Sequence, residues 1–582
     1  MRLTLGKNDL NKHTAQTAAQ LLVQALLSEG VDTVFCVPGE SYLDVIDALY
    51  EVQDRIRLVV CRHEGSAAFM AEAYAKASGR PGVCFVTRAP GATQASIGLH
   101  TAHQDSTPLV LFIGQAASGM LEREAFQELD YRRVFSPMAK WVAQVDDAQR
   151  MPEMVSRAFH TALLGRRGPV VLALPEDVLS RPVASPARLP QAVRAPQAVP
   201  SAAEVQELMT LLAAAQRPLV ILGGSGWTPQ AVADMRQFLH ATGLPVVCSF
   251  RRQDLFDNRD PQFVGVLGLG ADPALHRAVR ESDLLLLLGS RMGEVPSAGY
   301  TLIDLPQPQQ KLVHAMPSPE ELGKVYRPDL ALLASMPALA ATLAGCPVPQ
   351  DWPARWAQHR QSARAAYERY SLPPAPAEAD QASPAHTVDQ AQAWRALNEA
   401  LPDDVVVTNG AGNYTAYLHR YYRYPSFGSQ IAPTSGAMGY GLPAAIGAKL
   451  ACPERPVVCV AGDGCFMMSS HELITAVRLG LSIVVLVFDN RMFGTIRMHQ
   501  ERWFPGRVYG TDLDNPDFVA LARAHGARAQ AIDSLEQLLT AVQDGLNASG
   551  PTLLHVRTDP ERIGPNGTIT AIRQKALASP AA

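Results

Sequence analysis

Short apolar runs alternate along most of the chain with stretches in which apolar residues recur at helical spacing. Most of these runs are rich in leucine or β-branched residues and end near Gly, Pro, Asp or Asn, as buried strands do. Continuous apolar strands separated by helices are typical of parallel sheets covered by helices on both faces. The pattern therefore predicts an α/β fold. Its clearest runs are Leu58–Cys61, Val83–Thr87, Leu109–Ile113, Val170–Leu174, Leu219–Leu222, Leu284–Leu288, Val405–Val407, Val457–Ala461, Ile483–Phe488 and Leu553–Val556.

Two proline-rich stretches interrupt this alternation. Residues 180–203 and 371–386 show no periodicity, which is typical of extended linkers between domains. The blocks that they separate have the usual size of a domain. We therefore expect three domains, at 13–182, 203–345 and 387–565, each built on a doubly wound parallel sheet.

Composition narrows the class of protein. The chain has 582 residues, of which 47% are apolar and 18% charged, so it can bury several cores and is unlike a disordered protein. Its formal charge is −4 without a dense Lys/Arg block, which argues against a nucleic-acid partner. No apolar run reaches the roughly 18 residues of a membrane span. Scattered cysteines without a CxxC pair, and a start without an apolar signal segment, predict a cytoplasmic protein with reduced thiols.

The strongest chemical signal follows the run Val457–Ala461. That run ends in GDG (462–464), a helix-like stretch comes next, and the run Ile483–Phe488 ends in Asp-Asn. A strand–helix–strand unit makes both strands parallel, so Asp463 and Asn490 are expected at neighbouring carboxyl ends, where α/β sheets bind ligands. A carboxylate and an amide oxygen suit Mg²⁺, and the glycines let the backbone approach a phosphate. The tripeptide alone would be only a tight turn.

The spacing GDG-x25-N resembles the thiamine-diphosphate (ThDP) binding motif. Four further segments, in consistent order, are similar to those of the catalytic subunits of acetolactate synthases. They are RHEGSAAFMAEAYA (62–75), VTRAPGAT (86–93), AFQE (125–128) and GAMGYGLPAAIG (436–447). The resemblance runs from about residue 14 to 560. It implies a pyrimidine-binding domain, a Rossmann-like middle domain and a diphosphate-binding domain, with ThDP and Mg²⁺ as cofactors.

Glu64 opens an Ala-rich helix after a strand, where a carboxylate is favourable for structural reasons alone. The resemblance implies that it also hydrogen-bonds N1′ of the ThDP aminopyrimidine, so that the 4′-imino form takes the C2 proton. It further implies that Phe126 and Gln127 line the approach to the reacting carbon. For Glu40, in PGES (38–41), a plain turn residue and a site residue are equally consistent with the sequence.

The other residues that the resemblance implies belong to the cofactor. Met438 would lie beneath the bent cofactor, although a methionine that fills a core gap is also common. Asp463, Asn490 and the Met492 carbonyl would bind the metal ion. The full cofactor-binding set is Glu64, Pro38, Gly39, Gly410, Gly412, Asn413, Gly436, Met438, Gly462, Asp463, Gly464, Cys465, Asn490 and Met492.

The chain departs from the family pattern at several positions. The second arginine of the family's RFDDR segment, which grips the acceptor carboxylate, falls on Val295, while the first is retained as Arg291. The loss of this arginine argues against a 2-keto acid as acceptor. It also argues against FAD, which stays an open possibility. The family's tryptophan falls on His499, and Arg497 is a candidate for the missing carboxylate clamp. The remaining replaced positions are Arg88, Ala89 and Cys465.

These observations predict an enzyme that decarboxylates a 2-keto acid, most simply pyruvate, and joins the remaining acyl unit to a second carbonyl. Acetolactate synthases do this in branched-chain amino acid biosynthesis. The alternatives are a ThDP-dependent decarboxylase or lyase with another acyl donor and, from a different class, a catalytically silent cofactor-binding relative. Intact Glu64, Asp463 and Asn490 argue against the silent relative. We expect a homodimer or homotetramer, with Glu64 and Asp463 of each site from different chains, and leave a regulatory subunit open.

Overall fold

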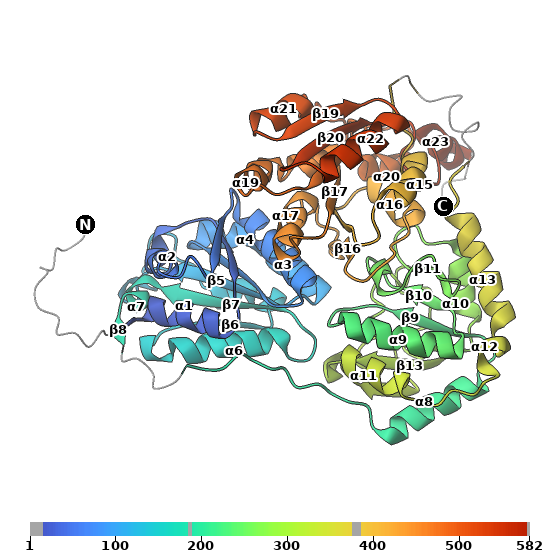
Figure 1. Cartoon of the computed structure of the whole chain (residues 1–582), viewed down its shortest axis with the longest axis horizontal. Helices are drawn as coiled ribbons and strands as arrows, with labels where there is room; N and C mark the ends of the chain where they lie inside the picture. The colour runs from blue at the N-terminus through green and yellow to red at the C-terminus, as the bar shows by residue number, and fades with distance from the viewer. Residues whose placement is uncertain (1–15, 184–188, 375–383, 385, 579–582) are drawn as a thin grey trace, which may run out of the picture.

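A computed structural model describes residues 16–183, 189–374, 384 and 386–578. The expected start of the first domain, at 13–15, and parts of both expected linkers lie outside these residues. The described chain forms three six-stranded sheets, each parallel throughout and covered by helices (Figure 1). The α/β class and the three-sheet architecture are thereby confirmed, whereas the domain boundaries stay a prediction.

The first sheet has the strand order β3-β2-β4-β5-β7-β6. The chain runs outward from β2 to β3 and then returns to β4, so the order reverses between β2 and β4. Short strands β1 (Gln16–Thr17) and β8 (Pro182–Val183) pair antiparallel beside it. The strands are β2 (Thr33–Cys36), β3 (Arg57–Val60), β4 (Gly82–Val86), β5 (Leu109–Gln115), β6 (Trp141–Gln144) and β7 (Pro169–Pro175). The helices are α1 (Ala18–Ser28), α2 (Leu43–Tyr50), α3 (Glu64–Ser78), α4 (Ala89–Asp105), α5 (Tyr131–Phe135), α6 (Met151–Leu163) and α7 (Glu176–Leu179).

The central sheet has the order β11-β10-β9-β12-β13-β14, which is the order of a Rossmann fold, with its reversal between β9 and β12. Trp352, Trp356 and Tyr367 belong to its core, so helices after residue 345 pack with this sheet. The strands are β9 (Pro218–Leu222), β10 (Val246–Cys248), β11 (Phe263–Val266), β12 (Leu284–Leu288), β13 (Lys311–Met316) and β14 (Leu330–Leu333). The helices are α8 (Ala202–Ala214), α9 (Pro229–Thr242), α10 (Pro273–Glu281), α11 (Met336–Ala344), α12 (Trp352–Arg355) and α13 (Ala357–Tyr370).

The third sheet, ordered β16-β15-β17-β18-β20-β19, repeats the topology of the first. Its order reverses between β15 and β17, and β17 pairs parallel with β18, as the sequence predicts. The strands are β15 (Val406–Asn409), β16 (Gln430–Ile431), β17 (Val457–Gly462), β18 (Val484–Asp489), β19 (Arg528–Ile532) and β20 (Thr552–Arg557). The helices are α15 (Gln390–Ala400), α16 (Tyr414–Tyr421), α17 (Gly441–Ala451), α18 (Asp463–Met467), α19 (Leu473–Arg478), α20 (Gly494–Trp503), α21 (Phe518–Ala524), α22 (Leu535–Leu546) and α23 (Ile569–Ala578).

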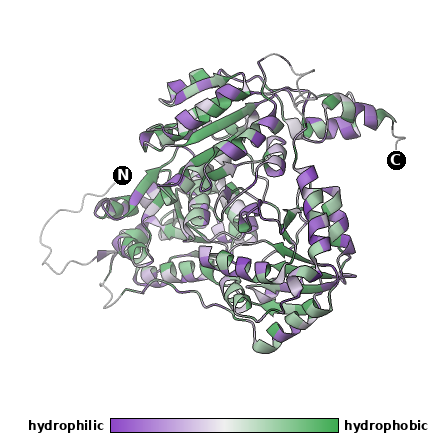
Figure 2. Cartoon of the chain, turned by 45° about the vertical axis from the view of Figure 1, so that its right-hand side comes forward, coloured by the Kyte–Doolittle hydropathy of each residue, from purple (hydrophilic) through white to green (hydrophobic). Residues whose placement is uncertain are grey.

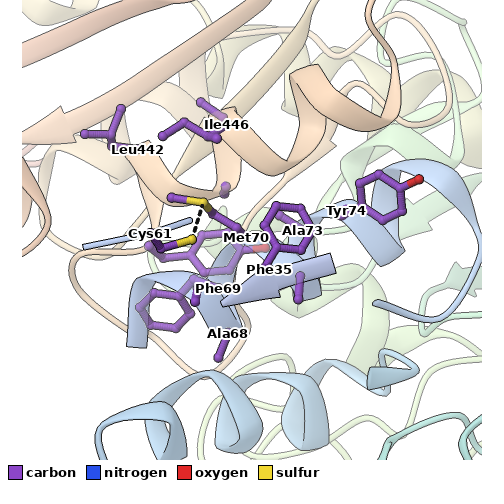
Figure 3. Close-up of a cluster of buried hydrophobic side chains, with 14 of the residues drawn as sticks. Phe35, Cys61, Ala68, Phe69, Met70, Ala73, Tyr74, Leu442 and Ile446 are labelled. Atoms are coloured by element: carbon purple, nitrogen blue, oxygen red, sulfur yellow. Dashed lines mark hydrogen bonds between the residues drawn. The ribbon is translucent and has the colours of Figure 1, made fainter. Parts of the chain in front are cut away.

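The first and third domains share one hydrophobic core, built where α3 packs on α17. Figure 3 shows Phe69 and Met70 of α3 on one side of this contact and Leu442 and Ile446 of α17 on the other. The helices lie close together because Gly447 has no side chain: a Cβ there would come within 2.3 Å of the Met70 carbonyl oxygen. The small residues of both helix motifs therefore serve this interface.

Hydropathy follows the layers of the fold. Figure 2 shows that strands are mostly hydrophobic, while helices carry both hydrophobic and hydrophilic residues. A helix with one apolar stripe covers a sheet with that stripe and exposes the rest. Within the described parts of the chain, no helix combines the length and the apolar character needed to cross a membrane.

Candidate functional site

Glu64 lies at the carboxyl edge of the first sheet, where it begins α3 directly after β3. His63 caps the helix, since its Nδ1 accepts a hydrogen bond from the Gly65 amide at 3.0 Å. Gly91, in the first turn of α4, leaves space beside Glu64: a Cβ on Gly91 would lie 3.0 Å from Glu64 Oε1 and 3.0 Å from Thr87 Cγ2. The half-buried carboxylate therefore borders a gap that only a glycine keeps open.

Pro38 and Gly39 follow β2 at the same edge, next to the reversal of strand order. A Cβ on Gly39 would come within 2.4 Å of Thr87 Cβ, so this turn lies against the end of β4. Ligands of doubly wound sheets bind at such a reversal. The structure thus brings Pro38 and Gly39 to the edge that carries Glu64.

Phe126 and Gln127 belong to an irregular segment that reaches the start of α4. The Ala89 amide donates a hydrogen bond to the Gln127 carbonyl at 3.1 Å, and Gln127 has a positive φ of 62°. Phe126 is 71% exposed in the single chain. Both residues therefore lie at the same edge as Glu64, and the ring of Phe126 is open to a further partner.

Asp463 lies at the carboxyl edge of the third sheet, where it begins α18 after β17. Its side chain is buried, with Oδ1 accepting from the Gly464 amide at 2.9 Å and Oδ2 from Asn515 Nδ2 at 2.8 Å. Burial and the neighbouring Asp489 raise the pKa of Asp463 to about 7. Asn515 also donates to Asp489 Oδ1 at 2.9 Å, and His555 Nε2 lies 2.9 Å from Asp489 Oδ2.

Asn515 and His555 were not among the residues expected from the sequence. Asn515 precedes a proline in a loop and His555 lies within β20, so neither position carries a local signal of a site. Together they hold two acidic side chains at the ends of neighbouring strands. An uncompensated pair of buried carboxylates is unfavourable, which makes this edge suited to a cation.

Asn490 and Met492 lie on the turn that follows β18. The Met492 amide donates to Asn490 Oδ1 at 3.3 Å, and Arg491 between them has a positive φ of 57°. Among the described residues, no three His, Cys, Asp or Glu side chains converge as metal ligands. The predicted Mg²⁺ ligands are the Asp463 carboxylate, the Asn490 amide oxygen and the Met492 carbonyl. Only Asp463 is one of those four residue types, so this set is not a cluster of that kind.

Cys465 joins three loops of the third domain. Its buried Sγ accepts hydrogen bonds from the Gly439 amide at 3.2 Å and from the Tyr414 hydroxyl at 3.3 Å. A Cβ on Gly410 would come within 2.5 Å of the same sulfur. In the described structure the thiol thus contacts protein groups, and Tyr414, which the sequence did not single out, completes the cluster.

The glycines beside this cluster allow close packing against side chains. Tyr414 lies over two of them, since a Cβ on Gly412 or on Gly462 would come within 2.9 Å of its ring. Asn413 is held at both ends of its amide, by the Ile563 carbonyl at 2.8 Å and the Thr495 hydroxyl at 2.8 Å. These residues follow β15 and β17, on the two sides of the strand reversal.

Gly436 and Met438 lie on the turn before α17 and not beside Glu64 of the same chain. Gly436 has a φ of 70°, and half-buried Met438 packs on the third domain's core. Two residues on, Tyr440 contacts Phe69, Glu72 and Lys76 of α3. These positions are five to twelve residues beyond Glu64, a rise of about 8–18 Å along the helix. One chain therefore does not bring all the predicted site residues together.

A cavity of about 490 Å³ lies between the three domains. It sits at the strand reversal of the Rossmann sheet, where Gly224 has a φ of 70° and a Cβ would come within 1.9 Å of the Gly289 carbonyl oxygen. Arginines line it densely, and burial lowers the pKa of Arg251 and Arg291. The arginines concerned are Arg166, Arg167, Arg251, Arg252 and Arg291. The cavity thus suits a large anionic ligand.

The positions that depart from the family pattern lie in different surroundings. Val295 lines the cavity between the domains, and His499 is exposed on α20. Arg497, the candidate carboxylate clamp, donates its Nε to Glu501 at 3.0 Å, and its side chain is only 12% exposed. Glu501 also pairs with Arg573, and Arg497 Nη1 lies 3.9 Å from Asp512 Oδ1, so Arg497 is already paired with carboxylates and its role in binding substrate stays an untested prediction.

Comparisons with known proteins agree with this architecture. Residues 16–134, 205–343 and 410–556 match, in turn, the N-terminal TPP binding domain, the central domain and the C-terminal TPP binding domain of the thiamine pyrophosphate enzymes, TPP being another name for ThDP. The chain is 34% identical to the acetolactate synthase isozyme 2 large subunit of Escherichia coli K12, over 93% of this chain and 95% of that protein.

Two further relatives come from other organisms. The chain is 32% identical to the acetolactate synthase large subunit of Parasynechococcus marenigrum, over 95% of this chain and 90% of the relative. It is 28% identical to a probable acetolactate synthase large subunit of Methanocaldococcus jannaschii, over 97% and 96%. The chain therefore belongs to the thiamine pyrophosphate-dependent enzymes of the acetolactate synthase large-subunit family.

Proposed function

We propose that this chain catalyses the ThDP- and Mg²⁺-dependent decarboxylation of a 2-keto acid, pyruvate, and transfers the remaining acyl unit to a second carbonyl. The observation that carries the proposal is a pair of glycine-lined sheet edges on two sheets of the same topology, one with Glu64 and one with Asp463. The names of the relatives support the same reaction. A cytoplasmic location belongs to this proposal and is supported by eight free cysteines.

The residues at the third sheet fit a diphosphate bound through a divalent cation. Asp463 would bind Mg²⁺, because its buried carboxylate lies beside a second acidic side chain that a cation would offset. The Asn490 amide oxygen and the Met492 carbonyl would add neutral oxygen ligands, as Mg²⁺ accepts. Gly412 and Gly462 carry no side chain, so their backbone would let a diphosphate approach closely on the side away from the Tyr414 ring.

The residues at the first sheet would hold a proton on the cofactor and keep water from the reacting carbon. When bound, ThDP supplies the electron sink for the pair left behind by CO₂. Glu64 would hold a proton at N1′ of the cofactor's pyrimidine, and Gly91 keeps the space beside its Oε1 free. Phe126 and Gln127 would border the reacting carbon and keep water from it, which favours ligation over simple protonation.

We infer that two chains complete each site. In one chain the turn of Met438 adjoins the middle and end of α3, while Glu64 lies at its start. A second copy in a symmetric dimer would present its third domain to the exposed edge at Phe126. Each site would then take Glu64 from one chain and Asp463 from the other.

We propose FAD for the cavity between the domains, although Val295 departs from the family pattern there. The glycine turn Gly224–Gly226 at the end of β9 lets a diphosphate approach the backbone, and five arginines line the space. Among the residues that the structure describes, the buried Nε of Arg251 has no hydrogen-bond partner, which leaves it available to an anion. A flavin absorbance spectrum of the purified protein, or its appearance on adding FAD, tests this assignment; a spectrum unchanged by FAD contradicts it.

The proposed reaction is tested on purified protein with ThDP, Mg²⁺ and pyruvate, with products identified by mass and NMR. Acetolactate, or another ligation product when an aldehyde is added, supports the proposal. Acetaldehyde with CO₂ and no ligation product would make the protein a decarboxylase instead. Glu64→Gln is expected to abolish turnover while ThDP still binds, whereas a silent cofactor-binding relative would show no turnover even before the change.

The shared site is tested by mixing two inactive variants, Glu64→Gln and Asp463→Asn. In a mixed dimer one site carries both changes and the other carries neither. Random mixing is therefore expected to restore up to about a quarter of the wild-type activity. Sites contained within single chains would give no recovery, and a variant pair in the same domain, Glu64→Gln with Gly91→Val, serves as the control that should not recover.

A further inference from the structure

The carboxyl edge of the first sheet carries three charged side chains that the proposed reaction does not yet use. Arg88 follows β4, Glu40 follows β2 and Glu176 follows β7. Arg88 Nη2 donates to Glu176 Oε2 at 2.7 Å, and Arg88 Nη1 lies 3.7 Å from Glu40 Oε1. One guanidinium thus pairs with two carboxylates, so the three side chains together carry a net negative formal charge.

Glu40 is the outward-facing member of the group. Its side chain is 70% exposed, compared with 36% for Glu176 and 9% for Arg88. Within the described parts of the chain, the buried Nε of Arg88 has no hydrogen-bond partner, and the low exposure of the side chain places the guanidinium beneath the carboxylates. A ligand that approaches this edge therefore meets the carboxylate of Glu40 before the charge of Arg88.

Glu40 also lies close to Glu64 through one shared neighbour, Thr87. A Cβ on Gly39, next to Glu40, would come within 2.4 Å of Thr87 Cβ. On its other side, Thr87 lies beside the space at Gly91 that borders Glu64 Oε1. The Glu40 turn after β2 and Thr87 after β4 thus flank the strand reversal where ligands of such sheets bind, and Glu64 borders Thr87 through the space at Gly91.

The cations suggested for gripping a substrate carboxylate are already engaged. Arg497 donates to Glu501, whose carboxylate also accepts from Arg573 at 2.7 and 2.8 Å, and a second carboxylate, Asp512, lies 3.9 Å from Arg497 Nη1. Arg291 donates to the Gln104 carbonyl at 2.6 Å in the cavity between the domains. The second arginine of the family pattern is Val295. An acceptor with its own carboxylate would therefore meet Glu40 without a matching cation.

We propose that Glu40, held in place by Arg88, makes this site select an uncharged carbonyl acceptor over a second 2-keto acid. The inference rests on the proposed decarboxylation and ligation. The acyl unit left after loss of CO₂ forms a carbon–carbon bond with the acceptor's carbonyl carbon, and the acceptor oxygen takes a proton. Pyruvate, propanal and one proton thus give a five-carbon hydroxyketone and CO₂. Like charges in a partly buried site repel, so Glu40 disfavours an anionic acceptor.

The donor step is measured first, without added aldehyde. Two ferricyanide ions take one electron each as the acyl unit of pyruvate leaves as acetate, with addition of one water and release of two protons, so CO₂ release reports decarboxylation without ligation to an aldehyde. CO₂ release with ThDP and Mg²⁺ supports the proposed function whatever the acceptor. If no CO₂ is released, both the proposed donor and the acceptor inference are overturned.

The acceptor is then tested by competition between pyruvate and propanal at equal concentration, with the ratio of hydroxyketone to acetolactate as the readout. Wild type is expected to favour the hydroxyketone. Glu40→Gln should move the ratio toward acetolactate by about tenfold, as expected for removing one like charge from a partly screened site. Glu51→Gln, which removes the same charge at the opposite end of α2, should leave the ratio within about twofold.

Arg88 is a positioning residue because it acts by holding Glu40. Its test therefore uses two substitutions that distinguish loss of this contact from a general loss of folding. Arg88→Ser should move the ratio in the same direction as Glu40→Gln, and Arg88→Lys should restore most of the preference, because an ammonium still serves the two carboxylates. A predominance of acetolactate in wild type would overturn the proposal. So would a ratio that Glu40→Gln and Glu51→Gln change equally.

Discussion

Replacing Lys76 by methionine would remove the one positive charge from a buried group that joins the first and third domains. Lys76 Nζ pairs with Asp105 and, at 3.0 Å, with Glu72, and it also donates to the Ala432 carbonyl at 3.1 Å. The carboxylates of Glu72 and Asp105 are 0% and 2% exposed. Tyr440 of the third domain donates its hydroxyl to Glu72. Methionine fills a similar volume, so charge is the main change.

The magnitude follows from the burial of the group. Burial raises the pKa of Glu72, while the two carboxylates outweigh burial at Lys76 and raise its pKa. Removing one partner from a buried ion pair leaves an uncompensated charge and typically destabilises by about 3–5 kcal/mol. Arg80→Met is the matched control, because Arg80 pairs with Asp32 on the surface, with side chains 47% and 48% exposed. Such exposed pairs contribute about 0–1 kcal/mol.

The assay is urea unfolding followed by circular dichroism, with the first transition compared among wild type and the two variants. The loss in Lys76→Met is expected to shrink from about pH 8 to about pH 5. Burial raises the pKa of Glu72, and without the lysine nothing positive in the ion pair opposes this, so protonation stabilises the folded variant as the pH falls. A loss equal to that of Arg80→Met, or one independent of pH, would refute the reasoning.

Three further results are expected. Gly91→Ala should lower kcat about 100-fold with an unchanged melting temperature, because its Cβ would lie 3.0 Å from Glu64 Oε1 and displace it; an unaffected kcat would contradict the placement. Glu501 has a pKa lowered to about 2, chiefly by Arg573, so the stability that it contributes is present above about pH 4.5 and lost as the pH falls toward 2. Hydrogen exchange of residues 569–578 should rise over that window in wild type, and Glu501→Gln should exchange fast at every pH. Asn515→Leu, which removes the amide between two carboxylates, should weaken Mg²⁺ binding about 10–100-fold in titrations of cofactor binding; equal affinity would show that Asn515 does not support the site.

Local patterns in the sequence were enough to predict the three parallel sheets and the two edges that carry the site. The runs that formed β17 and β18 were recognisable because a strand buried on both faces is apolar throughout. Their parallel pairing placed Asp463 and Asn490 at one edge, since a helix between two strands permits no other simple connection. Glu64, by contrast, was singled out by the family resemblance, and the sequence correctly put it at the start of a helix.

Other features depend on contacts between segments far apart in the chain, so only the tertiary structure decided them. Asn515 meets Asp463 and Asp489 through a loop whose own residues carry no periodic signal. The sulfur of Cys465 meets Gly439 and Tyr414, and the cavity between the domains takes its lining from all three.

The charged group at the first sheet shows the same division most clearly. The sequence showed that Arg88 departs from the family pattern. Its partners Glu40 and Glu176, however, follow two other strands. Strand order and helix packing bring these three side chains together, and a local pattern of apolar and polar residues contains no information about which distant side chains will meet. Sequence alone therefore determined the scaffold and the residues proposed for the cofactor, while packing decided the charges that surround them.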